Sequence, residues 1–234
     1  MDHILCFLIR IFVAFSRWAK TFARLGIGSY DEWEQGRPVK ILIAGYNGAR
    51  NTGADARVAA AVRQIKELFG TDKIKITVMT MSKENMQGYF HEDIDLFQFS
   101  SIYIKDLYRA CSTHHAAVLC EGSTLKSTFA NALSMFYCEA AGIMSRQGKP
   151  CITFGSEVGS MDGFLKRMAE DMCKDTYFIA RTRESQLILN EMGIKNHLGT
   201  DTAWLYEDEI SSAHAEDLLR LQGWDGKNHC WAYQ

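Results

Sequence analysis

The sequence predicts an α/β fold with a doubly wound, mostly parallel sheet. Short apolar segments alternate along the chain with longer helical segments, which implies crossover connections between parallel strands. The apolar segments are continuous, as expected for strands that are covered on both faces. The chain has 234 residues, of which 47% are hydrophobic and 23% charged. These ordinary globular values exclude a disordered or fibrous protein.

Each predicted strand is a short apolar segment bounded by Gly, Pro or polar residues. The first lies between Pro38 and Gly45 and leads into a helix whose apolar residues recur at helical spacing. The predicted strands cover residues 39–44, 74–80, 94–99, 116–120, 151–154, 177–181 and 196–199. The predicted helices cover residues 54–69, 101–112, 129–147, 161–174, 183–192 and 211–222.

The main domain is therefore expected over residues 38–205, preceded by an amphipathic helix within residues 1–30. Residues 206–234 are expected to hold a linker helix and the start of a second domain. Residues 229–233 have the composition of a strand, but the sequence ends directly after them. We therefore expect a second domain of which this chain carries only the beginning.

The first thirty residues allow two interpretations. The apolar segment 4–15 is interrupted and too short to span a bilayer, which takes about 20 residues. On a helix, four basic residues share one stripe, and no acid lies between Asp2 and Asp31 (Arg10, Arg17, Lys20 and Arg24). Residues 1–26 could lie on an anionic membrane surface, or they could pack on this protein or on another subunit. The composition suits both, and the oligomeric state stays open.

Charge and cysteine content narrow the classes of partner. The net charge of −2, from 26 basic and 28 acidic residues, gives no basic footprint for nucleic acid, so no nucleic-acid partner is expected. The seven cysteines form no CxxC motif and lie near no His at zinc-finger spacing. Free thiols without a structural metal are therefore expected, as in a cytoplasmic protein.

In open parallel sheets, ligands bind at the carboxyl ends of the strands. The loop after the first predicted strand contains three glycines that permit close backbone approach (Gly45, Gly48 and Gly53). Its polar residues exceed what a turn requires (Asn47, Arg50, Asn51 and Asp55). The spacing matches neither GxGxxG nor a P-loop. The loop is interpreted as an anion site at a helix N-terminus, or as a tight turn with Thr52 as N-cap.

Three more loops follow predicted strands. Residues 121–127 offer hydroxyls that could cap a helix, and a lysine that would add positive charge there (Glu121, Ser123, Thr124, Lys126 and Ser127). Glu157 lies between small residues, where a general acid, an acceptor for a sugar hydroxyl or a surface turn would fit. Arg181 follows a buried strand and needs an anionic partner. That partner is a ligand or an internal carboxylate such as Asp201.

In these loops the sequence resembles the polysaccharide pyruvyl transferase family. The resemblance covers residues 38–205 and depends on the order and spacing of several motifs (residues 43–48, 51–57, 120–125, 154–159, 180–185 and 199–203). It implies the N-terminal domain of a GT-B-like fold. In that fold two Rossmann-like domains enclose the active site.

The resemblance also implies an activity, the transfer of a pyruvyl group from phosphoenolpyruvate onto a sugar. The acceptor would be a cell-surface polysaccharide or its lipid-linked precursor, which suits a cytoplasmic enzyme at the inner face of the membrane. Asp55 matches an acidic family position and is expected to act as acid/base or to orient a hydroxyl. Arg181 matches a family arginine and is expected to clamp an anion. The other loop residues would line the acceptor side, and the reaction needs neither cofactor nor metal.

The chain departs from the family pattern in three places. The acid of the first loop is shifted by one residue at Asp55, Glu121-Gly122-Ser123 replaces a triple-glycine turn, and Thr182 replaces an aspartate. The family's donor-binding His and Arg belong to the second domain, so the chain alone is expected to be weakly active or inactive. Two alternatives remain, a GT-B glycosyltransferase that uses a sugar nucleotide and a non-catalytic glycan-binding remnant.

Overall fold

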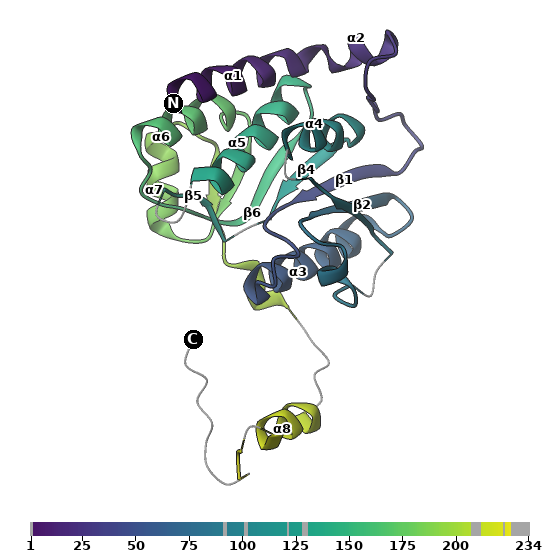
Figure 1. Cartoon of the computed structure of the whole chain (residues 1–234), viewed down its shortest axis with the longest axis vertical. Coiled ribbons are helices and arrows are strands. Elements are labelled where there is room, and N and C mark those ends of the chain that lie inside the picture. Colours follow the sequence, from purple (N-terminus) through teal and green to yellow (C-terminus); the bar gives the residue numbers. More distant parts are fainter. Residues whose placement is uncertain are drawn as a thin grey trace.

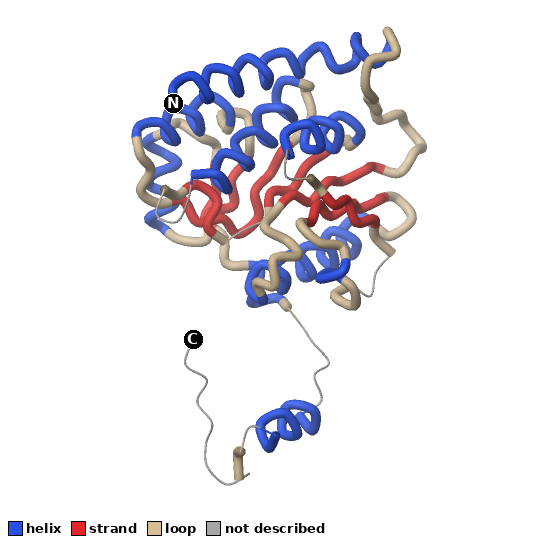
Figure 2. Tube along the Cα trace, in the orientation of Figure 1, coloured by secondary structure: helices blue, strands red, loops and turns tan. Residues whose placement is uncertain are grey.

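A computed structural model describes residues 2–90, 93–100, 103–120, 122–127, 131–206, 212–221 and 223–225. Its centre is an eight-stranded parallel sheet in the order β3-β2-β1-β4-β6-β7-β8, with β5 paired to β6 (Figures 1 and 2). The strands are β1 (Val39–Ala44), β2 (Ile74–Thr80), β3 (Asp95–Gln98), β4 (Ala116–Leu119), β5 (Ser123–Leu125), β6 (Cys151–Val158), β7 (Tyr177–Ala180) and β8 (Asn196–Leu198). The predicted doubly wound, parallel sheet is confirmed, and the fold is Rossmann-like.

Helices cover both faces of this sheet. One face carries α4 (Tyr103–Thr113), α5 (Asn131–Arg146), α6 (Gly163–Met172) and α7 (Arg183–Glu191), and the other carries α3 (Thr52–Phe69) and η2 (Glu84–Met86). A third layer, made of α1 (Asp2–Phe15), η1 (Ser16–Trp18) and α2 (Ala19–Arg24), lies across α4, α5 and α6 (Figure 1). The chain continues through η3 (Thr202–Leu205) and α8 (Ser212–Leu221). The strand expected at residues 229–233 lies outside the described residues.

Two predictions about strands were wrong. The strand predicted over residues 151–154 is β6, which runs to Val158. A register shift at Gly155, with φ +68°, lets the strand continue past the glycine. The loop expected at 121–127 includes the short strand β5, which pairs with the extended part of β6. The glycine and the short polar β5 hid this pairing from the sequence pattern.

The N-cap of α3 lies one residue before the predicted one, Thr52. Asn51 is the N-cap and its side chain accepts a hydrogen bond from the Ala54 amide, whereas Thr52 is the first helical residue. Asn and Thr are both good N-caps, so composition alone could not separate them.

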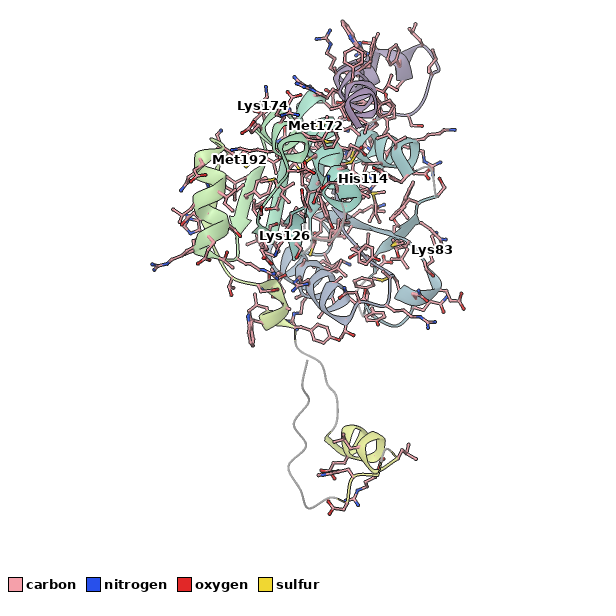
Figure 3. The ribbon with its side chains drawn as sticks, turned by 60° about the vertical axis from the view of Figure 1, so that its left-hand side comes forward. Lys83, His114, Lys126, Met172, Lys174 and Met192 are labelled. Atoms are coloured by element: carbon pink, nitrogen blue, oxygen red, sulfur yellow. The ribbon has the colours of Figure 1, made fainter. Side chains whose placement is uncertain are left out.

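The N-terminal helices pack on the body of the protein. Val13 and Ala19 are each 2% exposed, and Ile9 and Phe12 lie against the same apolar core. Gly142 in α5 makes this approach possible, because a Cβ there would lie 2.8 Å from Val13 Cγ1 and 3.2 Å from Met172 Cβ. Figure 3 shows Met172 on the side of the molecule that faces α1. The interpretation that these residues pack on this protein is therefore confirmed.

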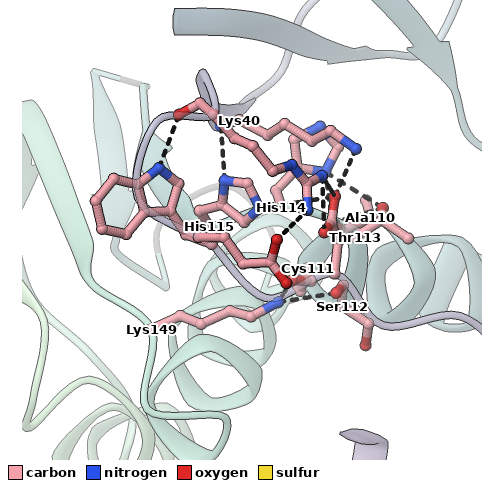
Figure 4. A network of polar contacts seen from close by, with 12 residues as sticks. Lys40, Ala110, Cys111, Ser112, Thr113, His114, His115 and Lys149 are labelled. Atoms are coloured by element: carbon pink, nitrogen blue, oxygen red, sulfur yellow. Dashed lines mark hydrogen bonds and ion pairs between the residues drawn. The ribbon is translucent and has the colours of Figure 1, made fainter. Parts of the chain in front are cut away.

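A polar network joins β1, the end of α4 and the segments before β4 and β6 at the amino edge of the sheet (Figure 4). Lys149 donates hydrogen bonds to the carbonyls of Cys111 and Ser112, and the Lys40 amide donates to His115 Nδ1 at 2.9 Å. His114 is buried, and burial lowers its pKa to about 4. Burial lowers the pKa of His115 as well, so both histidine rings are neutral and bond to groups of this protein.

Glu139 is a buried carboxyl group between α4 and α5. The residue is 1% exposed, and within the described residues its Oε2 has no hydrogen-bond partner. Burial raises the pKa of Glu139 to about 7, although the Tyr103 hydroxyl opposes that rise. The folded protein therefore prefers the protonated form of this group.

Replacing Gly142 with Val should destabilise the fold by about 1–3 kcal/mol, because the larger side chain would push α1 and α6 away from α5. Urea unfolding measures the loss, and limited proteolysis should show earlier cleavage within α1. Gly163→Ala is the control, since a Cβ there meets only the end of the Arg167 side chain at 3.4 Å. Equal stability of the two variants would contradict this packing.

The raised pKa of Glu139 predicts a pH-dependent stability term. Because the folded pKa of about 7 exceeds the unfolded value of 4.5, this term is lost as pH rises from 4.5 to 7 and amounts to about 3 kcal/mol. The stability of Glu139→Gln relative to wild type should therefore increase over this range in urea unfolding. The exposed Glu170→Gln is the control, and parallel curves for Glu139→Gln and wild type would contradict the assignment.

Candidate functional site

The carboxyl edge of the sheet holds the switch point of the fold. The chain leaves β1 toward β2 and β3, and it leaves β4 toward β6 and β7, so the loops after β1 and β4 diverge there. Ligands of doubly wound folds bind in such a crevice. The two strands approach closely, because a Cβ at Gly45 would lie 2.3 Å from the Cys120 carbonyl oxygen.

Five charged side chains form a continuous chain of ion pairs at this edge. Asp201 accepts two hydrogen bonds from Arg57, from Nε and Nη2, each at 2.8 Å. It also accepts one from Arg181 Nη1 at 2.8 Å. Arg181 Nη2 contacts Glu157, whose other oxygen accepts a bond from Lys126 Nζ at 2.9 Å. Together these five side chains are called the charge cluster below.

Each member of the charge cluster comes from a different element. Arg57 is in α3, Glu157 lies near the end of β6, and Arg181 directly follows β7. Lys126 directly follows β5, and Figure 3 shows it near the start of α3. Asp201 is the N-cap of η3, where its carboxylate also accepts the Ala203 amide. Segments far apart in the sequence therefore meet at one point.

The charge cluster carries one excess positive charge, from three cations and two carboxylates. Its side chains are between 15% and 26% exposed, so solvent reaches all of them. Burial alone would raise the pKa of Asp201, but hydrogen bonds from Arg57, the Ala203 amide and Arg181 lower it to about 2. The pKa of Glu157 is also lowered, because Lys126 and Arg181 outweigh the effect of burial. Both carboxyl groups are thus ionised at neutral pH.

The backbone at Gly122 lies directly against both guanidinium groups. A Cβ there would be 2.9 Å from Arg57 Cζ and 2.9 Å from Arg181 Nη1. A larger residue would push the arginines apart, so only glycine lets the backbone pack this closely against them. A close backbone approach of this kind is a common reason for glycine at a binding loop.

The structure brings together three of the residues expected in separate loops, namely Lys126, Glu157 and Arg181. Asp201 is the internal carboxylate that was considered as a partner of Arg181. Arg57 was missed as a site residue. The signal in the sequence was an arginine two residues after Asp55, in a helix that is otherwise rich in alanine.

Asp55 lies apart from the charge cluster. Residues that are two positions apart in a helix differ by about 200° in direction, so Asp55 and Arg57 point to opposite sides of α3. Asp55 is 1% exposed, and neither carboxylate oxygen forms a hydrogen bond of normal geometry with a described residue. Burial raises the pKa of Asp55, while the Gly48 amide and the Tyr89 hydroxyl, which face the carboxylate, oppose the rise. A raised pKa suits a group that exchanges protons.

The first loop also has a structural role. Asn47 is fully buried and donates a hydrogen bond from Nδ2 to the Met79 carbonyl, which ties the end of β1 to β2. Gly48 has φ +75°, and a Cβ there would lie 2.2 Å from Thr80 Oγ1. Thr52 and Gly53 form the first turn of α3. Arg50 has φ +57°, an uncommon conformation for a residue with a side chain.

The second loop differs from its prediction. Ser123 and Thr124 belong to β5, so they do not cap the following helix, and Ser127 accepts a hydrogen bond from the Asp162 amide. Lys126 does lie beside the first turn of α5, because its amide donates to Ser134 Oγ. Glu121 lies outside the described residues. Within the described part of the chain, no three His, Cys, Asp or Glu side chains are arranged to hold a metal.

Comparisons with known proteins add little to this geometry. No protein-family model matches the sequence, and no curated protein matches it significantly. Among solved structures, the chain is similar to a shikimate 5-dehydrogenase from Listeria monocytogenes in complex with shikimate and NAD, at 12% identity and a TM-score of 0.29. That match covers 88% of this chain and 62% of the dehydrogenase. A lactate dehydrogenase from Eimeria maxima with NADH and oxamate matches at 12% identity and a TM-score of 0.33, over 83% of this chain and 71% of its own.

Replacing Asp201 with Asn should lower the free energy of unfolding by about 2 kcal/mol at pH 7, because two arginines lose their shared carboxylate. Since the folded pKa of about 2 lies below the unfolded value of 3.8, the stabilisation is present above pH 4 and is lost toward pH 2. Urea unfolding at several pH values measures both effects. The exposed Asp72→Asn is the control, and a difference from wild type that does not change between pH 4 and 2 would contradict the assignment.

Proposed function

We propose that this chain is the N-terminal domain of a transferase that moves a pyruvyl group from phosphoenolpyruvate onto a sugar of a cell-surface polysaccharide or its precursor. The observation that carries this proposal is the excess positive charge of the charge cluster at the switch point of the sheet. The resemblance of the surrounding loops to polysaccharide pyruvyl transferases supplies the choice of reaction.

The chemistry requires cations that face an anionic donor. In pyruvyl transfer, a sugar hydroxyl adds to the central carbon of the enol while the methylene carbon takes up a proton. Phosphate then leaves, and a second hydroxyl captures the resulting centre to give a cyclic ketal. Arg181 and Lys126 would hold the anionic phosphate or carboxylate, since arginine and lysine are the usual partners of both groups. Arg57 would hold Arg181 in place through Asp201.

Asp55 is the proposed acid/base, and its burial sets a condition on that role. At 1% exposure, the carboxyl group cannot contact a sugar directly, whereas the facing Tyr89 is 36% exposed. Tyr89 would therefore be the group that contacts a hydroxyl on this side of α3. Because Arg57 and the charge cluster lie on the opposite side of α3, the acid/base role of Asp55 rests on the resemblance and not on the geometry of the cluster. The raised pKa of this buried carboxyl group favours its protonated form.

The proposed cellular position is peripheral, at the inner face of the membrane. None of the described helices combines the length and the apolar character that crossing a bilayer needs. A lipid-linked acceptor would favour an enzyme held at the surface of the bilayer by residues 1–26.

Isothermal titration calorimetry of this chain tests the donor assignment. Phosphoenolpyruvate should bind, and Lys126→Gln and Arg181→Gln should each weaken binding about tenfold or more, because each removes a charge-assisted contact. The matched control Arg183→Gln removes an exposed arginine two residues away and should bind as wild type does. Circular dichroism checks that each variant is folded.

Three results would reject this function. They are the absence of phosphoenolpyruvate binding, binding that neither variant weakens, and preferential binding of a sugar nucleotide. The last result would favour the glycosyltransferase alternative. Binding of a glycan alone, without either donor, would favour the non-catalytic one. Release of phosphate from phosphoenolpyruvate and a sugar acceptor, abolished by Asp55→Asn, would establish turnover.

A further inference from the structure

The outer face of the N-terminal helices exposes a stripe of large apolar side chains. Five positions at helical spacing point away from the core, with exposures between 38% and 64% (Phe7, Leu8, Ile11, Phe15 and Trp18). The opposite face of the same helices supplies Val13 and Ala19 to the core. The fold of this chain therefore leaves the outward apolar stripe unburied.

Basic residues flank this stripe and no acid interrupts it along the sequence, although Lys20 forms an ion pair with Glu32. The basic side chains of α1, η1 and α2 are Arg10, Arg17, Lys20 and Arg24, and no Asp or Glu occurs between Asp2 and Asp31. Arg17 lies over the ring of Trp18 at 5.1 Å, which places a cation directly beside an exposed aromatic side chain. An apolar face with basic flanks is typical of helices that lie in a membrane interface.

A groove between α1 and α6 continues this face. Its volume is about 540 Å³, and its apolar wall is formed by Phe7, Ile11 and Phe164. Three arginines and one aspartate complete the lining (Arg10, Arg146, Arg167 and Asp171). The groove therefore combines an apolar wall with a net charge of +2.

The arginines of the groove are only partly neutralised. Arg10 Nε and Arg146 Nη2 lie 2.9 Å and 3.5 Å from the carboxylate of Asp171. Arg167 is exposed and has no carboxylate within 4.0 Å among the described residues, although its charge helps to lower the pKa of Asp162. Guanidinium groups match phosphate with paired donors. The exposed guanidinium group of Arg167 is thus accessible to a phosphate.

We propose that the face formed by α1 and α6 binds the surface of an anionic membrane, with the phosphate of one anionic lipid in the groove between them. The apolar stripe enters the boundary between headgroups and acyl chains, and the arginines hold the phosphate. This inference deepens the peripheral position proposed above by naming its surface and its ligand. A second copy of the chain is a poor occupant, because symmetric pairing of this face would oppose like charges.

Co-sedimentation of the chain with lipid vesicles tests the proposal. Vesicles of phosphatidylcholine with a quarter phosphatidylglycerol should bind the wild type at least tenfold better than vesicles of phosphatidylcholine alone. Phe15→Ser combined with Trp18→Ser should reduce binding to the anionic vesicles at least tenfold. Arg167→Gln should reduce it about threefold to tenfold and weaken its dependence on salt.

Matched controls separate this surface from general stickiness. Leu187→Ser removes an apolar side chain that is 62% exposed on α7, and Arg183→Gln removes an exposed arginine of the same helix. Both should bind vesicles as the wild type does. The test variants should keep the circular dichroism spectrum and thermal midpoint of the wild type, because they alter only exposed side chains.

The proposal is overturned if anionic and neutral vesicles bind equally, if neither binds, or if the variants bind as tightly as wild type. A dimer in light scattering that Phe15→Ser with Trp18→Ser dissociates would assign this face to a protein partner instead. Vesicle binding does not depend on the charge cluster. A chain that binds anionic vesicles but not phosphoenolpyruvate would therefore keep this inference and reject the proposed function.

Discussion

The arrangement of the carboxyl edge depends on the carboxylate of Asp201, which binds two arginines at once. Through Arg57 it holds the first turns of α3, and through Arg181 it holds the end of β7. Removing one member of a partly buried ion pair leaves the other charge without compensation, which costs more than the pair contributes. The loops at the switch point therefore share one electrostatic constraint.

The two sides of α3 carry groups with different charge and burial. One side of the helix presents the charge cluster, which is open to solvent and positively charged. The other side buries Asp55 beside Gly48 and Tyr89, where a carboxyl group becomes more difficult to ionise. The direction of successive helical residues therefore keeps Asp55 and the charge cluster on two sides of one element.

The proposed membrane-binding surface lies on another part of the fold. The layer of α1, η1 and α2 covers the helices on one face of the sheet, whereas the charge cluster lies at the carboxyl ends of the strands (Figure 1). The apolar stripe and the groove at α6 share no residue with the charge cluster. A membrane contact there would leave the carboxyl edge free for substrates.

Apart from β5, the sequence by itself determined the order and type of the main strands and helices, because continuous apolar segments and helical periodicity are local signals. β1 and β2 match their predicted bounds for this reason. It also placed Lys126, Glu157 and Arg181 in or beside loops that follow predicted strands. Only the tertiary structure decided that these three side chains join Arg57 and Asp201 in one cluster, since residues 57 and 201 meet through the folding of the whole sheet. The burial of Asp55 and the groove at α6 were likewise decided by packing between distant segments, which no local pattern encodes.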